Sequence, residues 1–557
     1  MSNETSGMHW SNIDRKTRAS IMIGLSLGMF IACLDGTVVA TAINAIMIDF
    51  NGYGEYSWVF TGFMLCETIM IPLAGKLSDQ YGRKPLFLIG LTVFLLGSVL
   101  CGISGNMTQL IAFRAIQGVG GGILIPVATA TVADLYSPAE RGKIQGMLGA
   151  VFAVAMCIGP FVGGFLTDNV SWHWVFFVNL PIGAVALLLA AKKFPKPVLQ
   201  DKVNVDYLGM AFLSAFLLVL LLFFTWVGVD FAWLSVETVV MVATAVALIA
   251  AFIFTEIRAK DAVIRPSLFR NKMFICCAVT MLIFGIGLMG VMTYMAVFMQ
   301  AVVGISATNT GMILLPLVAG MMITSLLSGF TVRRTGYRPW LIAGPIITAI
   351  SMVLLSTLGR GSDEATAIFF LFISGVGFGC VMSVVMIAAQ NSAKFDEMGM
   401  TTSTVNLFRS VGSTVAVGIF TTIINGRIAK ELAERLPSDI FGMVPHSTSV
   451  MNILSDPSKW SAELYAAVSG LPGGVPEFVN MILDSYGGGV TFAFLCSAFV
   501  VLLVLATAFF MKGKPPEEMD LPENLVNSEE GANEALSQTN WGPEGLAYSE
   551  EGVNDGQ

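Results

Sequence analysis

The chain has 557 residues, of which 55% are hydrophobic and 12% are charged, and its formal net charge is −8. A soluble protein carries about twice that charged fraction, and roughly fourteen apolar runs are long enough to span a lipid bilayer, so the composition excludes a soluble protein and predicts an all-α polytopic membrane protein. With three histidines, no basic cluster, no nucleophile elbow, no phosphate-binding loop and no metal-ligand spacing, there is no sign of an enzyme, of a metal or other cofactor, or of a nucleic-acid partner.

The N-terminal segment, residues 1–18, is polar and ends in basic residues, as expected of a cytoplasmic segment. The apolar run that follows continues past Asp35 to about residue 48 without a cleavage site, which predicts a retained first helix rather than a signal peptide. Asp35 lies near the middle of this span. A charged carboxylate among hydrocarbon is costly, so Asp35 is a candidate for taking up and releasing protons. The alternative is a permanently neutral or capping aspartate.

The second span, about residues 58–77, contains Glu67, a second acid at mid-membrane depth and a second candidate for proton coupling. A tight, charged turn with the sequence GKLSDQYGRKP follows at Gly75–Pro85. Asp79 can accept from helix-end N–H groups or pair with a cation. A turn that only sets topology would need the basic residues but not the glycines. The turn is therefore a candidate conformational switch, with its key residues at Gly75, Asp79, Gly82 and Arg83.

Two later helices, within Leu110–Gly164, carry the most distinctive polar groups. Arg114 is a charge at membrane depth, which costs a few kcal/mol on insertion scales and so marks a polar cavity or a paired site. Gln117 follows three residues later on the same face. We interpret Arg114 as a proton-coupling residue and Gln117 as a candidate for substrate binding. The alternative is a structural arginine that bonds helix ends.

The second of these helices has a small residue at every fourth position, at Ala155, Gly159 and Gly163, which lets two helices pack closely in lipid. Pro160 introduces a kink and removes one backbone hydrogen bond. This seam predicts a second switch element, formed by Gly159, Pro160, Gly163 and Gly164. Ordinary close packing of membrane helices is the alternative.

The C-terminal spans repeat the N-terminal ones. GFTVRRTGYRP at Gly329–Pro339 matches the Gly75–Pro85 turn 254 residues later, and GVGFG at Gly375–Gly379 matches GVGGG at Gly118–Gly122 257 residues later. The repeat predicts two six-helix bundles related by pseudo-two-fold symmetry, with two extra helices inserted between them.

The two copies differ in charge. Arg114 aligns with Leu371, and Asp79 aligns with Arg333. Coupling chemistry is therefore expected in the N-terminal bundle.

These features divide the chain into five segments. They are a cytoplasmic N-terminal segment (1–18), the N-terminal bundle (19–193), linkers with the two inserted helices (194–271), the C-terminal bundle with a long outer loop at about 425–488 (272–511), and an acidic, disordered cytoplasmic tail (512–557). In this arrangement 23 of the 30 Lys and Arg residues fall in cytoplasmic segments and five in outer loops. That asymmetry places both termini in the cytoplasm.

A substrate cavity is expected between the two bundles, lined by soft side chains of the ninth span. Four methionines follow helical spacing there, with Tyr294 and Phe298 between them, and flexible thioethers suit varied apolar ligands. Filler that faces lipid or neighbouring helices is the alternative. Asn406 and Arg409 in the thirteenth span are either polar cavity groups or groups that bond helices together. The candidate substrate-binding residues are Gln117, Tyr294, Met295, Phe298 and Asn406.

Four of these motifs resemble signatures of the major facilitator superfamily, specifically its fourteen-helix drug/proton antiporters of the multidrug efflux type. GKLSDQYGRKP is similar to the signature of the helix 2–3 turn, and LIAFRAIQGVG to that of the fourth helix. AMCIGPFVGG resembles the antiporter signature of the fifth helix, and LDGTVVATAIN that of the first. The resemblance covers about residues 19–511 and implies a proton-linked role for Arg114.

Together these features predict a proton-coupled antiporter, and not an enzyme, that exports amphipathic drugs or similar small molecules by alternating access. The protein is expected to be a monomer in the cell (inner or plasma) membrane, with a small-molecule substrate and protons as its partners. One alternative is export of a single dedicated metabolite, such as an antibiotic, a siderophore or an amino acid. Another is a non-transporting membrane sensor or scaffold.

Overall fold

The computed structural model describes residues 14–50, 56–136, 138–194, 206–227, 231, 233–259, 262–305, 307–393, 397–436, 462–471 and 474–511. Within these residues, 14 helical spans are long and apolar enough to cross a membrane. The prediction of an all-α polytopic membrane protein is confirmed. The first 13 residues, much of the expected outer loop and the expected disordered tail from residue 512 lie outside the described residues.

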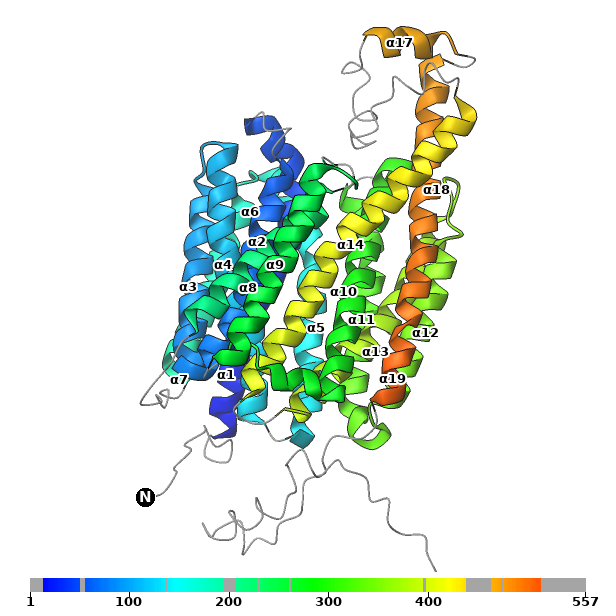
Figure 1. Ribbon diagram of the computed structural model, residues 1–557. Helices are drawn as coiled ribbons and strands as arrows, with labels where there is room; N and C mark the ends of the chain where they lie inside the picture. The colour runs from blue at the N-terminus through cyan, green and yellow to red at the C-terminus, as the bar shows by residue number, and fades with distance from the viewer. Residues whose placement is uncertain are drawn as a thin grey trace, which may run out of the picture.

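Figure 1 shows two helical lobes standing next to each other, with α1 beginning at their lower end. The first lobe is built from α1 (Arg15–Phe50), α2 (Tyr56–Tyr81), α3 (Arg83–Gly102), α4 (Met107–Leu135), α5 (Pro138–Asn169), and α6 (Trp174–Phe177) with α7 (Asn179–Lys193), which together form one span. The two inserted helices are α8 (Tyr207–Trp226) and α9 (Val236–Arg258).

The second lobe follows a short 3-10 helix, η2 (Pro266–Arg270). It contains α10 (Lys272–Val297) with the π-helical turn η3 (Phe298–Val303), α11 (Ala307–Thr335), α12 (Arg338–Leu355), α13 (Glu364–Asn391), α14 (Met398–Arg435), α17 (Ala462–Ser469), α18 (Gly474–Leu502) and α19 (Val504–Phe510).

The glycine-rich repeat has the same packing role in both lobes. A Cβ atom on Gly118 would meet the Phe63 carbonyl of α2, and a Cβ atom on Gly375 would meet the Leu317 carbonyl of α11. The absence of a side chain at these positions lets α4 pack directly on α2, and α13 on α11. The internal sequence match therefore corresponds to one helix contact made twice, which supports the duplicated architecture.

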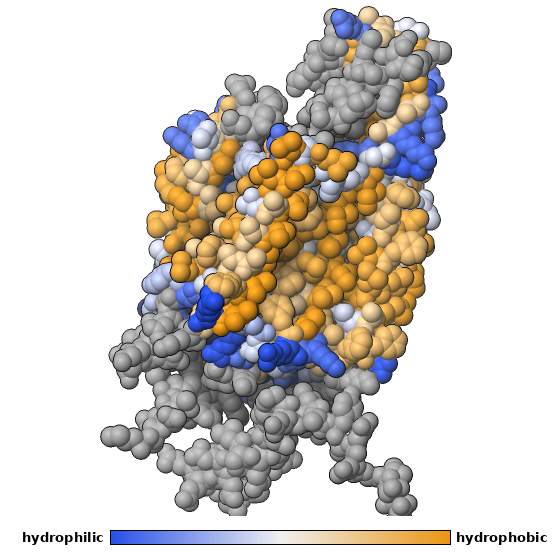
Figure 2. All heavy atoms as spheres, viewed as in Figure 1, coloured by the Kyte–Doolittle hydropathy of each residue, from blue (hydrophilic) through white to orange (hydrophobic). Residues whose placement is uncertain are grey.

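The outer face of the molecule is apolar. Figure 2 shows hydrophobic residues over the middle of the visible face and hydrophilic residues towards its upper and lower ends. Side chains such as Leu96 and Leu188 are more than half exposed. An exposed apolar belt with polar ends is the surface that a hydrocarbon layer would cover.

The structure differs from the sequence expectation at the outer loop, because two helices continue into the segment assigned to it. α14 has 38 residues, a length of about 57 Å, and Figure 1 shows its upper part rising with α18 above the tops of the neighbouring helices, with α17 at the top. Arg427 and Glu431 form an ion pair one turn apart at 3.0 Å, and Ile428 and Leu432 are buried on an adjacent face of the helix. Apolar burial on one face and an ion pair on the face beside it stabilise the extended helix.

The inserted helix α8 contacts both lobes. Trp226 of α8 lies edge-on against Trp58 of α2, with ring centroids 5.9 Å apart. On the other side, Gly418 of α14 packs against the backbone of Phe224. The insertion therefore lies where α2 and α14 approach each other.

Candidate functional site

An ion pair is buried in the interior of the first lobe. Asp35 on α1 is 1% exposed and Arg114 on α4 is 0% exposed, and an Nη1 atom of the arginine donates to Oδ2 of the aspartate. Gln117 and Asn179 donate to Oδ1 of Asp35 at 2.8 and 2.9 Å. The carboxylate thus accepts from three side chains, which is the environment of an ionised group whose charge is fully compensated.

The same network satisfies the arginine. Arg114 also donates to Oε1 of Gln117 at 2.8 Å and to the Val59 carbonyl at 3.2 Å. Its guanidinium lies over the Phe63 ring, 4.2 Å from the centroid. Ser98 of α3 accepts from Gln117 at 3.0 Å. The cluster ties together α1, α2, α3, α4 and α7, all from one lobe, and so acts as a fixed polar core within it.

The sequence reasoning placed Gln117 in the substrate cavity, whereas the structure places it inside this ion-pair cluster. It also did not select Asn179 or Ser98. Asn179 follows an aromatic-rich apolar run and is fully buried. A lone amide in such a run is the signal that points to a buried polar partner.

A second acid, Glu67 of α2, lies close to the interface between the lobes. The next residue, Thr68, shares a hydrogen bond of 2.7 Å with Ser410 of α14. Glu67 interacts electrostatically with Arg409, the neighbour of Ser410, and with Arg114 and Asp35. Within the described residues, Glu67 has no hydrogen bond or ion pair of its own, so its surroundings contrast with those of Asp35.

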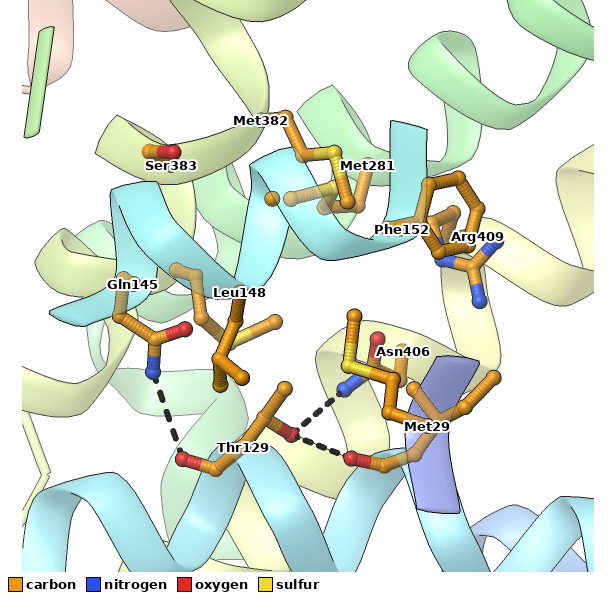
Figure 3. Close-up of a pocket in the computed structure, with 13 residues that line it drawn as sticks. Met29, Thr129, Gln145, Leu148, Phe152, Met281, Met382, Ser383, Asn406 and Arg409 are labelled. Carbon is orange, nitrogen blue, oxygen red and sulfur yellow. Dashed lines mark hydrogen bonds between the residues drawn. The ribbon is translucent and has the colours of Figure 1, made fainter. Parts of the chain in front are cut away.

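A small cavity of about 30 Å³ lies between the lobes, with room for water molecules but not for a drug. Figure 3 shows polar and sulfur-containing side chains converging on it from both lobes. Asn406 donates to the Thr129 hydroxyl at 3.4 Å, and Gln145 donates to the Thr129 carbonyl at 3.3 Å. The lining residues are Met29, Ile125, Thr129, Gln145, Leu148, Gly149, Phe152, Met281, Met382, Ser383, Met386, Asn406 and Arg409.

The expected substrate residues are therefore not all brought together. Asn406 lines this cavity, but Tyr294, Met295 and Phe298 are buried within the second lobe. Tyr294 stacks on Phe420 at 5.1 Å and shares a 2.7 Å hydrogen bond with Thr421. The methionines that line the cavity come from α1, α10 and α13, so no single helical stripe in the sequence marks them.

The α2–α3 turn contacts the second lobe at the lower end. Asp79 pairs with Arg83 at 2.6 Å and accepts from the backbone N–H of Met400, near the N-terminus of α14, at 2.9 Å. Arg83 also pairs with Asp134 of α4 at 2.7 Å. Gly82 has a φ of 89°, a left-handed conformation that favours glycine. Asp79 thus makes both of the bonds expected of it, with a cation and with a helix N-terminus.

Other contacts close the same end. A Cβ atom on Gly75 would meet Ser403 of α14. Gln145 of α5 and Gln390 of α13 share a hydrogen bond of 3.1 Å, and Arg141 of α5 donates to Asn391 of α13 at 3.0 Å. From the lower end up to the cavity, the lobes are therefore joined by hydrogen bonds and close helix contacts.

The α5 seam packs within the first lobe and touches the second. Cβ atoms on Gly159 and Gly163 would meet the hydroxyls of Thr37 and Thr41 on α1. Pro160 contacts Gly311 of α11. Gly164 is partly buried on the same helix. The kinked helix thus has one face on its own lobe and one on the other.

No group of His, Cys, Asp and Glu side chains within the described ranges has the arrangement of a metal site. The cysteines whose side chains the structure describes are unpaired and lie in the helices, five of them buried and two partly buried. Buried, unpaired cysteines pack as small apolar side chains.

Comparison with known proteins gives one family. The model of the Major Facilitator Superfamily matches residues 25–417. Multidrug transporter protein MdtP of Bacillus subtilis is 34% identical over 490 residues, covering 87% of this chain and 89% of that protein. Multidrug resistance protein 3 of the same organism is 33% identical over 494 residues, covering 88% and 94%. Efflux pump dotC of Dothistroma septosporum is 32% identical over 409 residues, covering 72% and 70%.

Solved structures show the same fold at low identity. A bacterial homologue of the human lysosomal transporter Spinster, in an inward-facing and unoccupied conformation, aligns with a TM-score of 0.57 at 14% identity, covering 90% of this chain and 98% of that one. The proton:xylose symporter XylE aligns with a TM-score of 0.57 at 12% identity, covering 90% and 97%. At these identities the likeness extends to the fold alone.

Proposed function

The chain belongs to the major facilitator superfamily, and from that premise we propose that it is a proton-coupled antiporter exporting amphipathic drugs or similar small molecules by alternating access. Relatives named as multidrug transporters and as an efflux pump support drug efflux. We place the protein in the cell membrane as a monomer with both termini in the cytoplasm, so the lower end in Figure 1 is the cytoplasmic end.

The main support for proton coupling is that the two mid-membrane acids differ in their hydrogen-bond partners. The Asp35 carboxylate accepts hydrogen bonds from Arg114, Gln117 and Asn179, and these donors stabilise its negative charge. Glu67 is half-buried, and within the described residues it has no hydrogen bond or ion pair. A carboxylate with weak local compensation is the one that gains most from binding a proton. We therefore assign proton exchange to Glu67, and we assign Asp35 and Arg114 to the fixed charges that surround it.

The contacts at the cytoplasmic end support a conformation that is closed to the cytoplasm. In the proposed cycle, a proton from outside binds Glu67, and the lobes then separate at the cytoplasmic end. The Asp79–Met400 bond and the Gln145–Gln390 bond break in that step. Substrate enters from the cytoplasm, the proton leaves, and the lobes close again around the substrate. Gly75 and Gly82 in the turn, and the Gly159–Gly164 seam, are the proposed pivots.

The driving force is sufficient for export. One proton moving through 100 mV releases about 2.3 kcal/mol, which corresponds to roughly a fifty-fold gradient at ~1.4 kcal/mol per decade. A single exchanging carboxylate can therefore drive substantial accumulation outside the cell.

The interlobe cavity is the proposed substrate site in its contracted state. Four methionines and Phe152 line it together with Asn406 and Arg409, and thioethers adapt to ligands of different shapes. Its volume of about 30 Å³ must increase by roughly tenfold to reach the size of ordinary ligand pockets. Parting of the lobes supplies that increase, since both lobes contribute to the lining.

The test is dye efflux from proteoliposomes under an imposed pH gradient. Wild-type protein is expected to move dye only when the gradient is present, and Glu67→Gln is expected to remove the response to the gradient. Asp35→Asn is expected to lower the amount of folded protein as well as transport. Dye movement that ignores the gradient, or a Glu67→Gln variant that couples normally, would contradict the proposal.

A further inference from the structure

Arg409 of α14 is a charged group of the second lobe that faces the interface. It lines the cavity, and its guanidinium lies 5.4 Å from the centroid of the Phe152 ring of α5. Figure 3 shows Arg409 next to Phe152 at the edge of the cavity. Among the described residues no acceptor takes a hydrogen bond from this guanidinium, so its charge depends on more distant partners.

The partner that the geometry provides is Glu67. The hydrogen bond between Thr68 and Ser410, 2.7 Å long, joins the residues that directly follow Glu67 and Arg409 on facing helices. This bond joins α2 and α14 directly beside the two charged residues. Their electrostatic interaction crosses from one lobe to the other.

The other charges near Glu67 are already compensated. Asp35 on α1 and Arg114 on α4 form their own ion pair. Cys33 of α1 is another titratable group that interacts with Arg409 and Glu67. Helix α8 packs on α2 from the other side. It contains no Asp, Glu, Lys, Arg or His, and its one ionisable side chain is Tyr207 at its first position. Protonating Glu67 therefore leaves Arg409 without its countercharge.

We propose that Arg409 couples proton binding to lobe movement, as a positioning residue that acts through Glu67. The inference rests on the proposed function and adds the link between the proton and the conformational change. Ionised Glu67 attracts Arg409 across the interface and holds the lobes together at mid-depth. A proton that moves from the outer solvent to the Glu67 carboxylate removes this attraction, and the contacts at the cytoplasmic end then separate.

The test measures the cytoplasmic opening directly. Tyr81 at the end of α2 and Arg334 near the end of α11 are both exposed and belong to different lobes. Spin labels at Tyr81→Cys and Arg334→Cys, in full-length protein reconstituted in nanodiscs, report the separation of the lobes by pulsed distance measurement. With wild-type Glu67 and Arg409, the population with a long distance is expected to increase as pH falls from 9 to 5.

Arg409→Gln is expected to raise the long-distance population at pH 9 towards the wild-type value at pH 5 and to remove most of its pH response, because the attraction that holds the lobes together across the interface is gone. Arg409→Lys is expected to recover most of the wild-type midpoint. Arg427→Gln is the matched control, since Arg427 lies on the same helix above the interface and pairs with Glu431. Glu67→Gln is expected to open the cytoplasmic end at every pH, and adding Arg409→Gln to it is expected to change nothing further.

A purely structural role for Arg409 has a different outcome. In that case Arg409→Gln leaves the pH midpoint of opening unchanged, and its effect adds to that of Glu67→Gln. Either result would overturn the inference. The outcome is separable from the proposed function, because wild-type proteoliposomes that move dye along a pH gradient would still be antiporters even if Arg409 proved irrelevant to the opening.

Discussion

The buried Asp35–Arg114 pair allows a prediction with a magnitude. Replacing Arg114 with Met removes one donor to Asp35 and the whole compensating charge, while Gln117 and Asn179 remain. An uncompensated charge left in a buried site costs about 3–5 kcal/mol. In the double variant, Asp35→Asn with Arg114→Met, no charge is stranded, and the remaining cost is that of lost hydrogen bonds, each about 1 kcal/mol. The double variant is therefore expected to be more stable than Arg114→Met alone.

The assay is a double-mutant cycle on the free energy of unfolding of the purified protein in detergent. The expected coupling between the two positions is about 2–4 kcal/mol. Single-variant penalties that add to within about 0.5 kcal/mol would show that the two residues are not a stabilising pair.

Three further predictions concern the contacts between the lobes. Asp79→Ala removes a carboxylate from the N-terminus of α14 and from Arg83. The closed state is expected to lose about 1–2 kcal/mol of stability, which increases cytoplasmic opening in the spin-label measurement. An unchanged distance between the labels would refute this prediction. Gly82→Ala places an alanine at a position where the backbone φ is 89°. The strain is expected to lower the free energy of unfolding by about 1–2 kcal/mol. Chemical denaturation measures it, with an Ala substitution at an exposed helical site as the control. Burial raises the pKa of Tyr337, which lies between α11 and α12, to about 12, above its ordinary value near 10. The stability that the neutral side chain contributes is therefore retained up to pH ~10 and is lost as pH rises from there to 12. Tyr337→Phe is expected to remove this alkaline loss of stability in a pH series of thermal unfolding.

Much of the fold could be predicted because membrane helices leave a strong pattern in the sequence. The apolar runs fix the spans by length, and the matching glycine runs at Gly118 and Gly375 correspond to equivalent helix contacts. The outer segment was harder, because α14 leaves the apolar pattern at about residue 424 and continues as an amphipathic helix to Arg435. Hydropathy alone does not separate such a helix from a polar loop.

The individual charges of the site were visible in the sequence, but their pairing was not. Asp35 and Arg114 are 79 residues apart and come together only through the packing of α1 on α4. Asn179 comes from a third segment, which no local pattern connects to the first two. The cavity methionines come from several helices, so a search for a periodic stripe found the buried residues around Met295 instead. Contacts that depend on how helices dock carry no signal within any one helix.

The cores of the two lobes differ in charge at equivalent positions of the repeat. Leu371 and Ser374 occupy the repeat positions of Arg114 and Gln117, and both are fully buried. Ser374 is bonded to Ser351 of α12, so a neutral pair of hydroxyls occupies the place that the charged network has in the first lobe. A neutral core needs no countercharge and responds little to protons. Arg409 is the charged residue that the second lobe places at this interface, and the acid with which it interacts, Glu67, belongs to the other lobe. An electrostatic link that crosses between lobes, rather than lying within one, is the arrangement in which a single proton can change how the lobes meet.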